Sequence, residues 1–188
     1  MALRRKMPAS SNVRPHQYTL LMFAICCTRK LLDRGASFPL KTPVEPTTIL
    51  GNWYASILFA KPQQLVLCVS ERTLLPVVVT AKDIKKLPDR LASATKEMLL
   101  TIGVPLDQAE AEFLEMTCGY LAVTSNRSIL GSLNDLMYHL NHGLVVRPEH
   151  SHSDRSLRLA QIPLRAIGYA YSSEATLTLF AAAHASTI

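Results

Sequence analysis

The sequence predicts an α+β fold: one compact domain in which a mostly antiparallel sheet packs against three or four helices. Two observations predict this class. Apolar residues make up 48% of the 188-residue chain and charged residues 18%, which favours a packed core over disorder. Strand-like and helix-like segments also follow one another without the strict alternation that is typical of parallel α/β proteins.

The first half of the chain is predicted to be mainly β-structure. Apolar runs of strand length predict strands over 18–27, 51–60, 65–70 and 74–80. Pro76 indicates that the last of these is an edge strand or contains a bulge. A short basic helix is expected over 28–34, and three prolines make residues 36–48 an irregular connection.

The second half is predicted to be mainly helical. Helices are expected over 84–102, with a start near Leu87 as the alternative, and over 106–117. The second of these has an acidic outer face of Asp107, Glu110, Glu112 and Glu115. A strand over 119–124 leads into a helix that ends at Gly143. A polar loop over 147–155, a short helix over 156–163 and strands or helices over 167–171 and 176–182 complete the chain.

Charged residues are distributed unevenly along the chain. Residues 1–41 carry eight basic groups and one acidic group, a net charge of +7, whereas the other 147 residues carry 12 and 13, a net charge of −1. We expect a flexible basic N-terminal extension over 1–16, a single α+β domain over 17–182 and a C-terminal tail over 183–188. The basic end can attract phosphates or an anionic surface without specificity, although a solvated tail is the simpler interpretation.

The cysteines indicate the compartment. Cys26, Cys27, Cys68 and Cys118 form no C-x-x-C pair, and three of them lie in predicted buried strands. This pattern favours a reducing, cytoplasmic location. The apolar run 18–27 is too short to span a bilayer, and no convincing cleavage site makes it an export signal. No cofactor is indicated.

The segment 124–142 concentrates polar side chains beside a regular apolar pattern. On a helical wheel that advances about 100° per residue, one stripe holds Ser128, Ser132, Asp135, His139 and His142. Ile129, Leu133, Leu136, Met137 and Leu140 lie on the opposite side. Asn126 or Ser128 is expected to cap the helix. Gly131 costs a helix about 1 kcal/mol relative to alanine, which favours a close approach of backbone or ligand there.

This segment is the main candidate for a functional site. As a non-catalytic binding surface it would use Asn126, Arg127, Ser128, Ser132, Asn134, Asp135 and Tyr138. Arg127, together with the basic N-terminus, makes an anionic ligand or a nucleic acid a candidate partner. The Gly51-Asn52-Trp53 segment either lines a pocket near this helix or, through Trp53, anchors the core.

Three other interpretations of the segment stay open. A small hydrolase or nuclease would use Asp135, His139 and His142, which share a helix face and suit a metal, although no H-E-x-x-H motif is present. A Ser-His-Asp triad is disfavoured because one helix cannot easily hold all three members. The polar side chains could instead be an ordinary solvated helix face, or Asn126, Arg127 and Asn134 could fix the helix to the sheet.

Four segments together resemble an uncharacterised family of small bacterial and phage-associated proteins, a domain of unknown function. They are CTRKLL at 27–32, LGNWYA at 50–55, TSNRSILGSLNDL at 124–136, and Ile162-Pro163 with Ile-Gly-Tyr at 167–169. The resemblance extends over about residues 18–172. It implies an α+β domain that begins near the first strand. It brings no established activity, so it implies no catalytic residues.

Overall fold

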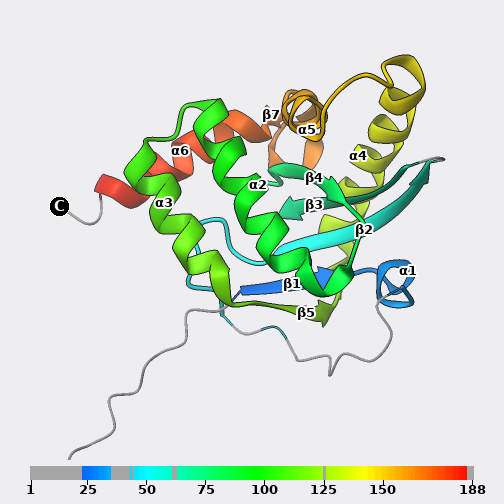
Figure 1. Ribbon diagram of the computed structural model, residues 1–188. Helices are drawn as coiled ribbons and strands as arrows, with labels where there is room; N and C mark the ends of the chain where they lie inside the picture. The colour runs from blue at the N-terminus through cyan, green and yellow to red at the C-terminus, as the bar shows by residue number, and fades with distance from the viewer. Residues whose placement is uncertain (1–22, 35–42, 44, 61–62, 125, 186–188) are drawn as a thin grey trace, which may run out of the picture.

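A five-stranded sheet with the order β4-β3-β2-β1-β5 forms the centre of the molecule (Figure 1). The computed structural model describes residues 23–34, 43, 45–60, 63–124 and 126–185. The strands are β1 (Phe23–Cys27), β2 (Trp53–Ala60), β3 (Gln63–Ser70), β4 (Pro76–Thr80) and β5 (Gly119–Val123). β1 runs parallel to β2 and β5, whereas the β2–β3 and β3–β4 pairs are antiparallel. The sheet is therefore mixed, whereas the sequence predicted a mostly antiparallel sheet.

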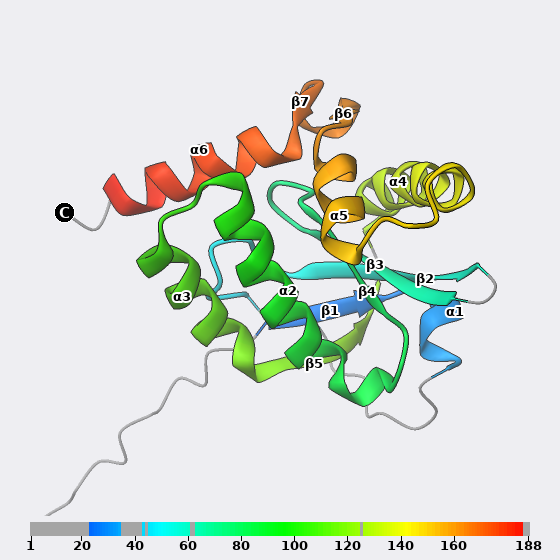
Figure 2. The ribbon, with the colours of Figure 1, turned by 45° about the horizontal axis from the view of Figure 1, so that its top comes forward.

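Helices cover both faces of this sheet, which confirms the α+β class. The described residues form α1 (Arg29–Leu32), α2 (Leu87–Ile102), α3 (Leu106–Glu115), α4 (Arg127–Val146), α5 (His152–Ala160) and α6 (Ser172–Ala185), more than the three or four expected. Figures 1 and 2 show α4 on the opposite side of the sheet from α2 and α3. A small hairpin of β6 (Pro163–Leu164) and β7 (Ala170–Tyr171) precedes α6. None of the described helices is long and apolar enough to cross a membrane.

The strands bury side chains on both faces, so the molecule has two apolar cores. In β3, Val66 and Cys68 pack in the core beneath α2, whereas Leu67 and Val69 pack in the core beneath α4. Successive strand residues point to opposite faces, which produces this division. Trp53 is fully buried on the α2 side, as expected of a core anchor. Burial on both faces explains why the strands are nearly continuous apolar runs in the sequence.

Several helix boundaries differ from the sequence prediction. The α4 helix continues past Gly143 to Val146, and α5 begins at His152, inside the predicted loop 147–155. A capping box starts α5: Ser151 Oγ accepts a hydrogen bond from Asp154 N, and Asp154 accepts one from Ser151 N. The segment 176–182 is helical and belongs to α6, which extends to Ala185, beyond the predicted domain end. The predicted extension 1–16 and residues 18–22 of the first predicted strand lie outside the described residues.

The β4 strand is an edge strand, as Pro76 at its start predicted. Its free edge faces α5, where Val78 N donates to Ser156 Oγ at 2.8 Å. Ser156 Oγ in turn donates to His152 O at 2.9 Å within α5. An exposed strand edge invites pairing with another chain, and α5 covers part of this one. The α5 helix therefore lies beside the sheet edge, between the two helical layers.

One acidic side chain joins α3 to the loop before β2. Glu112 is 1% exposed, and its carboxylate accepts hydrogen bonds from Ile49 N at 2.8 Å and Leu50 N at 3.0 Å. The prediction that Glu112 lies on the outer face of the helix is therefore wrong. Its partners are main-chain groups more than 60 positions away, which no local pattern reveals. Burial raises the pKa of Glu112 to about 7, although the two backbone hydrogen bonds oppose the rise.

Replacing Glu112 by alanine should destabilise the protein strongly. The change leaves the N–H groups of Ile49 and Leu50 without their acceptor. Each buried donor left unpaired costs about 1–3 kcal/mol, so we expect the free energy of unfolding to fall by roughly 2–5 kcal/mol. Urea denaturation measures this change. Glu110→Ala is the control, because it removes only the surface ion pair with Lys96 and should cost at most about 1 kcal/mol.

The contribution of Glu112 should also depend on pH. Its folded-state pKa of about 7 lies above the ordinary value of 4.5, so the folded state holds the proton more tightly than the unfolded state. This contribution is fully present below pH 4.5 and is lost as the pH rises through 7. The wild-type free energy of unfolding, minus that of Glu112→Gln, should therefore fall by about 3 kcal/mol across that interval. A difference that stays constant with pH would contradict the assignment.

Candidate functional site

The helix of the polar motif, α4, has the predicted cap and the predicted apolar face. Asn126 Oδ1 accepts hydrogen bonds from Ser128 N at 3.1 Å and Ile129 N at 3.2 Å. The buried face consists of Ile129, Leu133, Leu136 and Leu140, which pack in the core beneath the helix. The cap satisfies two of the amide groups that a helix start leaves unpaired. The sequence therefore predicted the start and the apolar face of this helix correctly.

The polar stripe of α4 does not act as one surface. Most of the candidate binding residues are exposed, namely Arg127, Ser128, Asn134, Asp135 and Tyr138. Ser132 is instead buried, with 8% of its surface exposed. A Cβ atom at Gly131 would meet open space, so no close approach of backbone explains that glycine. None of the seven predicted ligand-binding residues lines the groove or the pockets described below.

Asn126 also joins the motif to the segment around Trp53. The Asn126 side chain hydrogen-bonds to the hydroxyl of Tyr54, which donates to Glu71 Oε1 at 3.4 Å. Glu71 Oε2 accepts from Asn52 N at 3.0 Å, and Asn52 Oδ1 accepts from Ala24 N at 2.8 Å. Burial is the main cause that raises the pKa of Tyr54 to about 12, so its hydroxyl stays protonated. This network fixes the start of α4 to β1 and β2.

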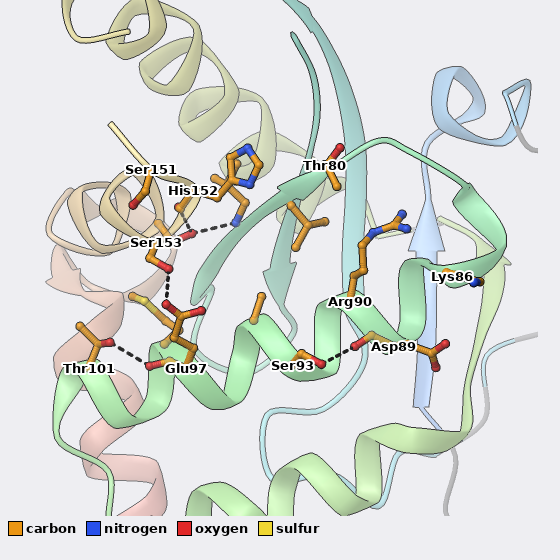
Figure 3. Close-up of a pocket in the computed structure, with 15 residues that line it drawn as sticks. Thr80, Lys86, Asp89, Arg90, Ser93, Glu97, Thr101, Ser151, His152 and Ser153 are labelled. Atoms are coloured by element: carbon orange, nitrogen blue, oxygen red, sulfur yellow. Dashed lines mark hydrogen bonds between the residues drawn. The ribbon is translucent and has the colours of Figure 1, made fainter. Parts of the chain in front are cut away.

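A groove of about 640 Å³ lies between β4, α2 and α5. Several of its hydroxyl groups are bonded to oxygen atoms of other residues in the groove. Figure 3 shows Ser153 Oγ donating to Glu97 Oε1 at 2.7 Å, and Ser93 Oγ donating to Asp89 O at 3.0 Å. Thr101 Oγ1 likewise donates to Glu97 O at 2.8 Å. A ligand in this groove would have to compete with bonds that the protein already makes.

A smaller pocket of about 230 Å³ lies between α4 and α5, and its walls are basic. We call it the basic pocket. Six cationic or imidazole side chains line it, namely His139, His142, Arg147, His150, Arg155 and Arg158. The remaining walls are formed by Leu140, Gly143, Val146, Leu159 and Ile162. No carboxylate is among these lining residues, so the pocket is chemically suited to an anion.

The local fold explains how these side chains come together. The last turn of α4, beyond Gly143, carries the chain to Arg147. Arg155 is 5% exposed and donates from Nη2 to Pro148 O at 2.9 Å, which holds the connecting segment against α5. Glu149 Oε1 lies 3.9 Å from His150 Nε2, but Glu149 is exposed and does not line the pocket. Arg155 is thus the residue that positions the connection between the two helices.

A second hollow of about 450 Å³ adjoins the basic pocket. His150 and Arg158 line both. The second hollow, which we call the adjoining hollow, is also lined by Asp154, Leu157 and Gln161, all on α5 or at its end. Hydrogen bonds from Ser151 hold the pKa of Asp154 below its usual value, so this carboxylate is ionised at neutral pH.

The structure gives no support to the predicted metal site. Among the described residues, no group of three or more His, Cys, Asp or Glu side chains is placed to hold a metal ion. His139 and His142 line the basic pocket, but Asp135 does not. Burial raises the pKa of Cys26 to about 11 and that of Cys27 to about 12, so neither is a ready nucleophile.

Sequence reasoning missed the four basic-pocket residues that follow α4. It placed Arg147, His150 and Arg155 in a polar loop and gave Arg158 no role. The available signal was the pair Ser151 and Asp154, because Ser-x-x-Asp has capping-box spacing and marks a helix start. A helix from 152 onward places Arg155 and Arg158 three residues apart, on neighbouring turns of one face.

The network at Asn126 should matter for stability, whereas Arg127 should not. We expect Asn126→Ala to lower the free energy of unfolding by about 0.5–2 kcal/mol, because the helix loses its cap. Arg127→Ala, at an exposed neighbouring position, should change it by less than about 0.5 kcal/mol. Urea denaturation of the two variants measures both values. Equal losses would show that Arg127 also fixes the helix to the sheet.

Comparison with known proteins places the chain in a family. No curated protein and no solved structure matches it. One family model does match, over residues 24–175, from within β1 into α6, and it confirms the resemblance that the motifs indicated. The matched region includes the Asn126 network and the whole basic pocket. The chain belongs to the family described as a domain of unknown function, DUF6933.

Proposed function

We propose that this protein is a non-catalytic binding module that captures a small anion in the basic pocket between α4 and α5. The observation that carries the proposal is the lining of the pocket, to which three arginines and three histidines contribute but no carboxylate residue does. Arginine stays charged at physiological pH and presents several N–H donors. Phosphate and carboxylate groups match that geometry, and bonds between charged partners are stronger than neutral ones.

Electrostatics and size both favour a small anion. Cationic side chains gathered around one hollow repel each other, and a bound anion offsets this repulsion. The pocket has a volume of about 230 Å³. That space admits a phosphate, a sulfate or a small carboxylate.

In this proposal the polar motif of α4 has two separate roles. Its first residue, Asn126, fixes the helix start through the cap and Tyr54. Its last residues, His139 and His142, face the anion. The exposed side chains between them, such as Arg127 and Tyr138, are not ligand contacts. The sequence predicted ligand contacts mainly in the N-terminal half of the helix, whereas this proposal places them at its C-terminal end.

The same pocket favours a second candidate, a hydrolase or nuclease that acts on a phosphate ester. Imidazole groups can transfer protons, and the neighbouring guanidinium groups would hold the anionic substrate. Asp135 has no place in this version, because it does not line the pocket. Turnover of a chromogenic phosphate diester that is lost in His142→Asn would favour this candidate over a pure binding role.

The cysteines favour a reducing compartment such as the cytoplasm. All four are free thiols, and Cys26, Cys27 and Cys68 are buried. Disulfide-forming compartments commonly use cysteine pairs to stabilise small domains, and this chain forms none among its described residues. The location is part of the proposal.

Inorganic phosphate should bind to the wild-type protein at low ionic strength, as measured by isothermal titration calorimetry. Arg158→Gln should weaken that binding about 10- to 100-fold, because a hydrogen bond to a charged group contributes about 1.5–3 kcal/mol. Added salt should weaken binding in the wild type.

Arg165→Gln is the matched control, since Arg165 is exposed and lies outside the pocket. It removes the same charge and should leave the phosphate affinity unchanged. Circular dichroism verifies that both variants fold. Arg158→Gln binding as tightly as wild type, or no saturable binding of phosphate to the wild type, would refute the proposed function.

A further inference from the structure

We infer that the ligand is a monophosphate of a small hydroxyl-rich molecule, a sugar or polyol, that occupies the basic pocket and the adjoining hollow together. The inference rests on the proposed function, because it takes the basic pocket as the phosphate site. It adds a second region of contact and thereby names the ligand class. His150 and Arg158 join the two regions, since both side chains line both hollows.

The adjoining hollow has the chemistry that hydroxyl groups need. Asp154 offers carboxylate oxygens that accept, and the Gln161 amide both donates and accepts. The two hydrogen bonds from Ser151 both go to Asp154 Oδ2, so they leave Oδ1 for a ligand hydroxyl. Leu157 adds an apolar surface between the polar groups, on which the C–H face of a sugar can pack.

The spacing along α5 gives the adjoining hollow a length that fits such a molecule. Leu157, Arg158 and Gln161 lie three, four and seven residues after Asp154, so all four share one side of the helix. From Asp154 to Gln161 the helix rises about 10 Å, at about 1.5 Å per residue. Arg158 lies between them, about 6 Å along the helix from Asp154 and about 4.5 Å from Gln161, so a sugar attached to a phosphate held near Arg158 reaches either residue.

The charge distribution sets the direction of the ligand. The basic pocket has three guanidinium groups and no carboxylate, whereas the adjoining hollow contains the carboxylate of Asp154. The phosphate therefore goes to the basic pocket and the hydroxyl groups to the adjoining hollow. A second phosphate at the far end of the ligand would face Asp154 and be repelled. The arrangement thus selects a monophosphate and disfavours a bisphosphate.

Calorimetric titration with four probes tests this inference. The probes are inorganic phosphate, ribose, ribose 5-phosphate and fructose 1,6-bisphosphate. We expect ribose 5-phosphate to bind at least 10-fold more tightly than inorganic phosphate, and ribose alone to show no measurable binding. Fructose 1,6-bisphosphate should bind more weakly than ribose 5-phosphate, because its second phosphate meets Asp154.

Two variants separate the adjoining hollow from the phosphate site. Gln161→Ala should reduce the advantage of ribose 5-phosphate while leaving the affinity for inorganic phosphate unchanged. Asp154→Asn should reduce the same advantage, and because it removes a negative charge beside Arg158, it should raise the affinity for inorganic phosphate if it changes it at all. Asp154 also belongs to the capping box, so thermal unfolding is compared for each variant. Gln161 is exposed and lies outside the capping box, at the C-terminal end of α5, where its main-chain N–H and not its side chain caps the helix. Its variant keeps the test valid if Asp154→Asn is unstable.

The outcomes distinguish the two proposals. If inorganic phosphate binds through Arg158 but ribose 5-phosphate binds no more tightly, the sugar-phosphate inference is overturned and the anion site stands. The same conclusion follows if Gln161→Ala and Asp154→Asn both leave the advantage intact. If neither phosphate nor ribose 5-phosphate binds, the proposed function itself fails.

Discussion

The position of α5 against the edge of the sheet is the constraint on which the surface features of this molecule depend. A hydrogen bond from Val78 N to Ser156 Oγ at 2.8 Å joins the helix to the free edge of β4. The helix then has α2 on one side and α4 on the other, and a hollow forms on each side of it. The groove and the basic pocket are therefore two consequences of one packing arrangement.

Much of the fold could be predicted because the sheet is buried on both faces. Strands covered on both sides are continuous apolar runs, so β2, β3 and β4 stand out in the sequence between turn residues. The pairing of β1 with β5 could not be predicted in the same way. Those strands are joined only through the long excursion over β2 to α3, and their parallel register, such as Ile25 beside Leu121, leaves no local signal.

The candidate site could be predicted only in part, because only its local features leave a signal in the sequence. The cap and apolar face of α4 are local features of one helix, and the sequence contains both. The basic pocket arises between two helices, and it depends on where Arg155 anchors the connection through Pro148 O. Glu112 is a second example. Its residue type and spacing predict a solvated position, but it is buried and accepts hydrogen bonds from main-chain groups that are distant in the sequence.

The basic lining of the proposed anion site depends on the positions of the acidic residues and not on the overall composition. Residues 42–188 carry 12 basic and 13 acidic groups, so the body of the protein has almost no net charge. Several acids are bound by donors elsewhere: Glu112 by the loop before β2, Glu71 by Asn52 N and Glu97 by Ser153. None of these three carboxylates lines the basic pocket, whose titratable residues are arginines and histidines. A nearly neutral domain can thus present a pocket lined by several basic residues, which is the basis of the proposed anion binding.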